Sequence, residues 1–231
     1  MEQSDLKSKL LQASLMHVAF DGWTRATFDA AIADAGISTA EALAVCPRGA
    51  VDLAVAYHEA GDAMMLERLR DADLSALKFR ERIIFAVRAR IEAVDDKEAV
   101  RRGTTLFALP QHAADGARLI WGTCDQIWSA LGDTSDDINW YSKRAILSGV
   151  YGATVLFWLG DESENNEATW AFLDRRIENV MQFEGLKAKI RSNAPLSRLI
   201  AGPMAILGRI KAPGARMSGF PGSVTHPDQG E

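Results

Sequence analysis

Apolar residues recur at spacings of three and four along almost the whole of this 231-residue chain. No segment keeps the apolar–polar alternation of a half-buried strand, so the periodicity predicts an all-α fold. We expect helices over residues 4–20, 27–35, 38–45, 50–69, 74–94, 97–108, 113–131, 134–159 and 167–183, with a shorter one over 195–211. Glycine or proline follows several of these segments, as is usual where a helix ends.

The composition narrows the class of protein. Apolar residues make up 48% and charged residues 25%, which is close to the globular average. Cys46 and Cys124 are too few for a disulfide framework and fit a reducing compartment. The first twenty residues lack the pattern of a secretory signal or a mitochondrial presequence. The longest uncharged internal run, residues 145–160, is shorter than a bilayer-spanning helix, so only peripheral membrane contact is expected.

The first three predicted helices are long, short and short, with Gly36 between the short pair, which is the pattern of a helix-turn-helix. We assign residues 1–48 to this unit and 49–185 to a larger helical domain. The arrangement resembles TetR-type regulators. In that family the second domain takes a ligand, and its last two long helices form a dimer.

The charge of the N-terminal region does not favour DNA binding. Residues 1–60 carry four basic and eight acidic side chains, a net charge of −4. The third helix, which would enter the major groove, has no Lys, Arg, Asn or Gln and carries only Glu41. Phosphate neutralisation and base readout need such residues. We therefore expect no binding to nucleic acid.

A polar and aromatic stripe marks the start of the helix predicted over 134–159, where Thr134 and Asp137 also predict a capping box. Asp137, Trp140, Tyr141 and Arg144 fall at i, i+3, i+4 and i+7, on one face of a helix. In one interpretation, Asp137 caps the helix and the aromatic rings pack into the core. In the other, the stripe binds a protein partner, because Trp, Tyr and Arg are enriched at interface hot spots.

The same helix carries no charge from Ala145 to Gly160, and a helix that is apolar on all sides is expected to be buried on all sides. It could be a central core helix or could also be buried between two copies of the chain. Ser148 with Gly152 and Gly149 with Ala153 place small residues four apart, which lets another helix approach closely.

Two segments of this region closely resemble the ninth Coq protein family of ubiquinone biosynthesis. They read GDTSDDINWYSKRAILSGVYGATVLFWLGDES, from Gly132, and ATWAFLDRRIENV, from Ala168. The resemblance implies a TetR-like fold without DNA binding, a homodimer, and a bound lipid such as an isoprenoid quinone intermediate. It further implies presentation of that substrate to the di-iron demethoxyubiquinone hydroxylase, with the family's partner-binding patch falling on Asp137, Trp140, Tyr141 and Arg144. Without a presequence, a bacterial member in the cytoplasm, peripherally associated with the inner membrane, is implied.

The C-terminal segment has a different electrostatic character. Residues 186–211 carry six basic and no acidic side chains and an apolar stripe, which is typical of a helix lying on a membrane surface. A terminal helix docked on the protein's own core is the alternative. The residues expected to bind the membrane are Leu196, Arg198, Leu199, Ile200, Leu207, Arg209, Ile210 and Lys211. The Gly/Pro-rich tail, 212–231, is predicted to be disordered.

No pattern in the chain predicts chemistry of its own. The sequence lacks a zinc-ligand pair, a nucleophile elbow, a P-loop and a dinucleotide fingerprint, so we expect no metal, no cofactor and no catalytic residue. The leading hypothesis is a non-enzymatic lipid-binding protein. A TetR-type repressor with an apolar ligand and an unrecognised small-molecule enzyme are the alternatives. The lipid is expected in a cavity between the fourth and ninth helices, whose lining residues the sequence does not identify.

Overall fold

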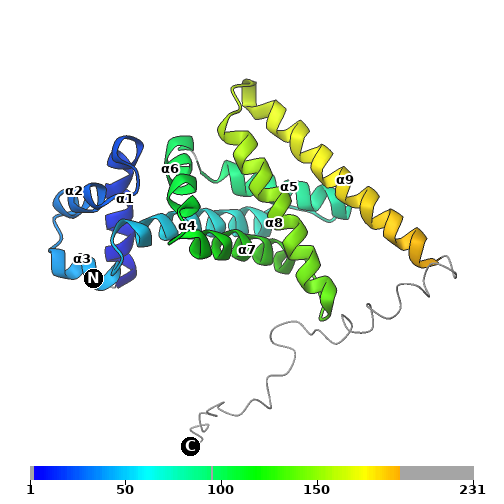
Figure 1. Ribbon diagram of the computed structural model, residues 1–231, viewed down its shortest axis with the longest axis horizontal. Coiled ribbons are helices and arrows are strands. Elements are labelled where there is room, and N and C mark those ends of the chain that lie inside the picture. Colours follow the sequence, from blue (N-terminus) through cyan, green and yellow to red (C-terminus); the bar gives the residue numbers. More distant parts are fainter. Residues whose placement is uncertain (1–2, 95, 193–231) are drawn as a thin grey trace, which may run out of the picture.

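Every regular element that the computed structural model describes, within residues 3–94 and 96–192, is helical (Figure 1). The first three helices, α1 (Gln3–Asp21), α2 (Arg25–Ala35) and α3 (Thr39–Val45), form a unit at one end of the molecule. The others are α4 (Ala50–Asp71), α5 (Phe79–Glu92), α6 (Lys97–Ala108), α7 (Ala113–Ala130), α8 (Ile138–Leu159) and α9 (Glu167–Ser192), with a 3-10 turn, η1 (Glu164–Asn166), before α9. The predicted all-α class is confirmed.

The N-terminal unit has the predicted helix-turn-helix geometry. Gly36 ends α2 at φ 61°, a left-handed conformation that glycine adopts at little cost. Ser38 caps α3 by accepting a hydrogen bond from the Glu41 amide, and the Glu41 carboxylate accepts one from the Ser38 amide, which completes a capping box.

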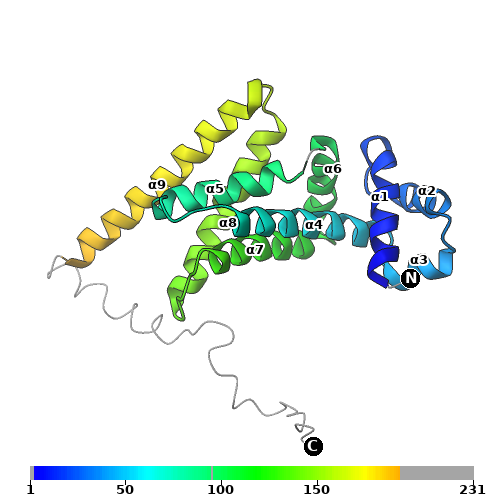
Figure 2. The ribbon, with the colours of Figure 1, turned by 180° about the vertical axis from the view of Figure 1, so that it is seen from behind.

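Two hydrophobic cores divide the described chain. One lies within the N-terminal unit, around Leu10 and Phe28, and the other lies among α4, α5, α7, α8 and α9, around Met65 and Ile127. Helix α4 joins them, because its first half packs Leu53 into the first core and its second half packs Met65 into the second. Figure 2 shows α4 running from the N-terminal unit into the helical domain, with α9 on the opposite side.

Two predicted helix starts are wrong. Helix α5 begins at Phe79 instead of residue 74, because Ser75 and Leu77 form a turn whose carbonyls accept hydrogen bonds from the Arg82 guanidinium. Helix α8 begins at Ile138 instead of residue 134. Its N-cap is Asp137, whose carboxylate accepts from the Asn139 amide, so the predicted capping box from Thr134 does not form.

The helix predicted over 195–211 lies outside the described residues. So do the tail and the whole predicted membrane-binding set: Leu196, Arg198, Leu199, Ile200, Leu207, Arg209, Ile210 and Lys211. Of the helices in the described ranges, none has both the length and the hydropathy to cross a membrane.

Candidate functional site

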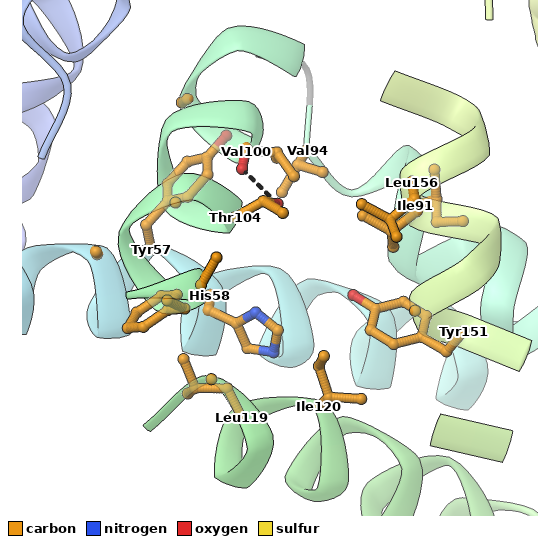
Figure 3. Close-up of a pocket in the computed structure, with 18 of the residues that line it drawn as sticks. Tyr57, His58, Ile91, Val94, Val100, Thr104, Leu119, Ile120, Tyr151 and Leu156 are labelled. Atoms are coloured by element: carbon orange, nitrogen blue, oxygen red, sulfur yellow. Dashed lines mark hydrogen bonds between the residues drawn. The ribbon is translucent and has the colours of Figure 1, made fainter. Parts of the chain in front are cut away.

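A cavity of about 350 Å³ lies among helices α4 to α8 (Figure 3). This volume is within the range of small-molecule sites. Each helix supplies part of the wall, and Trp23 reaches it from the turn between α1 and α2. The lining residues are Trp23, Ala54, Tyr57, His58, Arg90, Ile91, Val94, Ala99, Val100, Gly103, Thr104, Phe107, Ala108, Gly116, Ala117, Leu119, Ile120, Tyr151, Gly152, Val155, Leu156 and Trp158.

Most of the cavity wall is apolar, and the cavity is partly open to solvent. Ala108, Ala117 and Leu156 are the exposed members of the lining, so the opening lies where α6, α7 and α8 approach one another. Gly152 leaves free volume in the wall, because a Cβ atom built there meets no atom within 4 Å. Such a cavity favours a molecule whose greater part is hydrocarbon.

One side of the cavity holds a buried polar network. The Arg90 guanidinium donates from Nε to the Asp62 carboxylate at 2.5 Å and from Nη2 to the His58 carbonyl at 2.9 Å. The Thr123 hydroxyl lies 2.8 Å from both Asp62 Oδ1 and His58 Nε2. Gly61 permits this packing, since a Cβ atom there would lie 2.6 Å from Arg90 Nη1. The network thus fixes the His58 ring in the cavity wall.

Two ionisable groups of this wall are uncharged at neutral pH. Burial and the nearby Arg90 charge lower the pKa of His58 to about 4, against the weaker opposing effect of Asp62. Burial raises the pKa of Tyr151 to about 12 despite the stabilising charge of Arg90. Figure 3 shows the Tyr151 hydroxyl and the His58 imidazole pointing toward each other across the cavity. The wall therefore offers hydrogen bonds without a net charge.

The predicted stripe on α8 is divided between a helix cap and an aromatic cluster. Asp137 is the N-cap, as the first interpretation of the sequence proposed. Trp140 and Tyr141 are half-buried and contact edge to face, with ring centroids 4.8 Å apart. Trp121 of α7 packs against the Trp140 ring at 5.9 Å. The edges of this cluster remain accessible on the surface of α7 and α8.

Arg144, the fourth residue of the stripe, is only 2% exposed. Its guanidinium pairs with Asp125 at 2.5 Å and with Asp133 at 3.0 Å, and it lies 4.0 Å from the centroid of the Trp140 ring. Burial opposes ionisation of Asp133, but hydrogen bonds from Lys143, Ser135 and Arg144 lower its pKa to about 2. Arg144 thus supports Trp140 from within its own chain. Because Arg144 is buried, its side chain does not offer a surface for direct contact with a partner. Partner binding by the stripe as a whole stays a prediction.

The expectation that the uncharged part of α8 is buried on all sides is wrong for a single chain. Leu156 is 61% exposed and Phe157 37%, and Ala145 and Gly149 are also exposed. Phe157 stacks on Phe172 of α9, with ring centroids 4.5 Å apart. One face of α8 and the adjoining part of α9 are therefore apolar and uncovered in the described chain.

The sequence located the cavity only approximately. The lining comes from α4 to α8 together with Trp23, and it includes none of the α9 side chains that the structure describes. Among the aromatic residues of the helical domain, Phe107 and Trp158 line the cavity, whereas Phe85, Trp121, Trp128 and Trp170 pack elsewhere. Within the described chain, no group of three or more His, Cys, Asp or Glu side chains could hold a metal ion.

Comparisons with known proteins bear on the same helices. The family model COQ9 matches residues 113–184, which cover α7, α8, η1 and most of α9. The predicted resemblance to the COQ9 family is confirmed. A probable ubiquinone biosynthesis protein coq9, mitochondrial, of Dictyostelium discoideum is 28% identical over 77% of this chain and 60% of its own length. The mitochondrial ubiquinone biosynthesis protein COQ9 of Homo sapiens is 25% identical over 82% of this chain and 62% of its own. The chain spans about three fifths of these COQ9 relatives.

Among solved structures, the chain is similar to a TetR transcriptional regulator from Nitrosomonas europaea ATCC 19718. The TM-score is 0.62 at 19% identity, covering 75% of this chain and 97% of the regulator. This likeness confirms the predicted TetR-like fold, in which a helix-turn-helix unit precedes a helical domain. The fold does not by itself determine function.

Proposed function

We propose that this protein is a non-enzymatic lipid-binding accessory protein of ubiquinone biosynthesis. It binds isoprenoid quinone intermediates and presents them at the membrane to the demethoxyubiquinone hydroxylase. The observation that carries the proposal is the apolar cavity among α4 to α8, part of whose wall comes from the segment similar to COQ9. Names of the relatives place them in ubiquinone biosynthesis, and an apolar cavity suits the prenyl chain of such intermediates.

Lipid binding should raise the thermal stability of the protein. A ligand at about 100 times its dissociation constant stabilises the folded state by about 2.7 kcal/mol. We expect the melting temperature of delipidated protein to rise with the concentration of a prenylated quinone precursor. Native mass spectrometry before and after delipidation should show the lipid leaving and returning. Protein that carries no lipid and melts at one temperature at every precursor concentration would refute the proposed role.

The partner-binding part of the proposal rests on the stripe Asp137, Trp140, Tyr141 and Arg144. Trp140 and Tyr141 supply the accessible aromatic surface, Arg144 fixes the Trp140 ring from beneath, and Asp137 begins the helix. Replacing Trp140 with alanine should weaken association with the hydroxylase by about 2 kcal/mol or more. A pull-down combined with circular dichroism tests this. Loss of helical signal in the variant would place Trp140 in the core.

The uncovered face of α8 and α9 supports a homodimer of the TetR type. Gly149 is exposed there, and a Cβ atom at this position meets nothing within 4 Å, so Gly149→Arg leaves the chain's own packing intact. It would place a charge in the apolar interface, and we expect the dimer to dissociate. Analytical ultracentrifugation measures the change. A variant that sediments as the wild type does would exclude this face from the interface.

Membrane attachment is proposed for the basic segment 186–211, on the cytoplasmic side of a bacterial inner membrane. Each Lys or Arg near an anionic surface contributes about 1 kcal/mol, and the segment carries six. Flotation with liposomes should increase with the content of anionic lipid. If the protein floats with liposomes of no composition, the result would favour the alternative, a terminal helix docked on the protein's own core.

A TetR-type repressor with an apolar ligand is the second candidate, favoured by the structural likeness to a TetR regulator. The net charge of −4 over residues 1–60 argues against it, because specific DNA binding depends on contacts to phosphates. We expect no salt-dependent nanomolar binding in anisotropy titrations with duplex DNA at low salt. Such binding would support the repressor function instead.

A further inference from the structure

The polar wall of the cavity has a composition that lipid binding alone does not require. A hydrocarbon chain needs only apolar contact, and a buried polar group without a partner costs free energy. Yet His58 and Tyr151 face each other within the cavity lining (Figure 3), and Arg90, which is paired with Asp62, bonds to the His58 carbonyl. This arrangement places two facing hydrogen-bonding groups on one side of a mostly apolar site.

The two facing groups complement an oxygen atom of a ligand. Tyr151 keeps its proton over the whole physiological range and can donate, because burial raises its pKa to about 12. His58 is a neutral imidazole, whose Nε2 is occupied by the Thr123 hydroxyl at 2.8 Å. A carbonyl can accept from Tyr151, and a hydroxyl can bond to Tyr151 or to Nδ1, the ring nitrogen of His58 that Thr123 does not occupy.

The charges behind these groups cancel. Arg90 is 3% exposed and Asp62 4%, and they are bonded to each other at 2.5 Å. The Arg90 charge is therefore already compensated, and an anionic head group would bring an additional buried charge without a free counter-ion. Burial of an unpaired charge is far costlier than burial of a bonded carbonyl or hydroxyl.

The geometry points to a head-group subsite between His58 and Tyr151 for an uncharged, carbonyl- or hydroxyl-bearing head, with the apolar chain against the apolar remainder of the wall. This subsite deepens the proposed lipid-binding function and rests on it. Tyr151 and His58 are the specificity-determining residues, and Asp62 acts by compensating Arg90. The cavity thereby selects neutral prenylated phenols or quinones over fatty acids and prenyl phosphates.

Three probes with the same farnesyl chain test the subsite on the full-length protein by calorimetry at pH 7.5. They are a farnesylated phenol, the carboxylate farnesoate and the hydrocarbon farnesene. We expect the phenol to bind about three- to tenfold more tightly than farnesene, the effect of a net hydrogen bond. Farnesoate should bind at least about 30-fold more weakly than the phenol, because its charge is buried. Equal affinity for phenol and farnesoate would overturn the subsite while leaving lipid binding intact. Failure of all three to bind would overturn the proposed function as well.

Tyr151→Phe keeps the ring and removes only the hydroxyl. It should weaken binding of the phenol about three- to tenfold and leave the affinity for farnesene unchanged. Tyr57→Phe is the matched control, because Tyr57 lines the same cavity but its hydroxyl does not face His58 in Figure 3. An equal effect of Tyr151→Phe on phenol and farnesene would refute the head-group role. Asp62→Asn leaves the Arg90 charge uncompensated. It should therefore reduce the difference in affinity between farnesoate and the phenol. If the folded variant shows the same difference in affinity as the wild type, the charge of the Arg90–Asp62 pair does not determine the selectivity.

Discussion

Replacing Arg144 with alanine should lower the free energy of unfolding by about 3–5 kcal/mol. The guanidinium is 2% exposed and is shared between Asp125 and Asp133, and Asp133 is itself buried. Its removal leaves the Asp133 carboxylate with Lys143 as its counter-ion and Ser135 as a hydrogen-bond donor. It also withdraws the cation from the Trp140 ring. Urea denaturation followed by circular dichroism measures the loss.

A matched arginine provides the control. Arg25 pairs with Asp29 one turn along α2, and both side chains are largely exposed, so Arg25→Ala should leave the unfolding midpoint nearly unchanged. If Arg144→Ala were equally harmless, the buried pairs would contribute little, and Arg144 could again be considered a direct partner contact. If Arg144→Ala lowers the free energy of unfolding strongly, weaker partner binding by this variant would reflect unfolding and not a lost contact. Trp140→Ala is then the more informative variant for partner binding.

Local sequence signals predicted the helices well, because they act over a few residues. The spacing of apolar residues identified α6 to the residue, and the predicted start of α3 at residue 38 falls on its N-cap, Ser38. The start of α8 was misplaced, since Thr134 and Asp137 both satisfy the pattern of an N-cap. Only the surrounding loop decides between them, where Asp133 is held by Lys143 and Arg144.

The polar wall of the cavity was missed because it depends on contacts between distant segments. His58 and Asp62 lie one turn apart on α4, but Arg90 comes from α5 and Thr123 from α7. The available signal was weak: Asp62 next to Gly61 on α4, and Arg90 between the apolar residues Ala89 and Ile91 of α5. Neither signal identifies its partner, and the same patterns occur on solvated helix faces.

Side-chain burial on α8 was the other feature beyond the reach of the sequence. The partner-binding interpretation of the stripe required an accessible Arg144, yet two aspartates stabilise it inside. Leu156 was expected inside because it is apolar, yet it lies at the opening of the cavity and is exposed. Both exceptions concern the two regions to which we assign function, the aromatic cluster and the cavity opening.

Replacing Gly152 with leucine should weaken ligand binding about 100-fold without destabilising the protein. Gly152 lines the cavity, and a Cβ atom there meets nothing within 4 Å, so the new side chain extends into the space that a ligand would fill. Excluding three or four methylenes of ligand costs about 3 kcal/mol, or about 100-fold in affinity. Removing a glycine from the interior of α8 should meanwhile stabilise the helix by about 0.5–1 kcal/mol.

The matched control for this cavity-filling variant is Gly122→Leu. Gly122 lies within α7, its Cβ position is also free of contacts within 4 Å, and it is not part of the cavity lining. It should gain similar helix stability and keep the affinity of the wild type. Calorimetric titration with the farnesylated phenol, together with thermal melting, separates the two effects. If Gly152→Leu binds the farnesylated phenol as tightly as Gly122→Leu does, the ligand binds outside the cavity among α4 to α8. In that case the apolar cavity can no longer support the lipid-presenting function, whatever the similarity to COQ9.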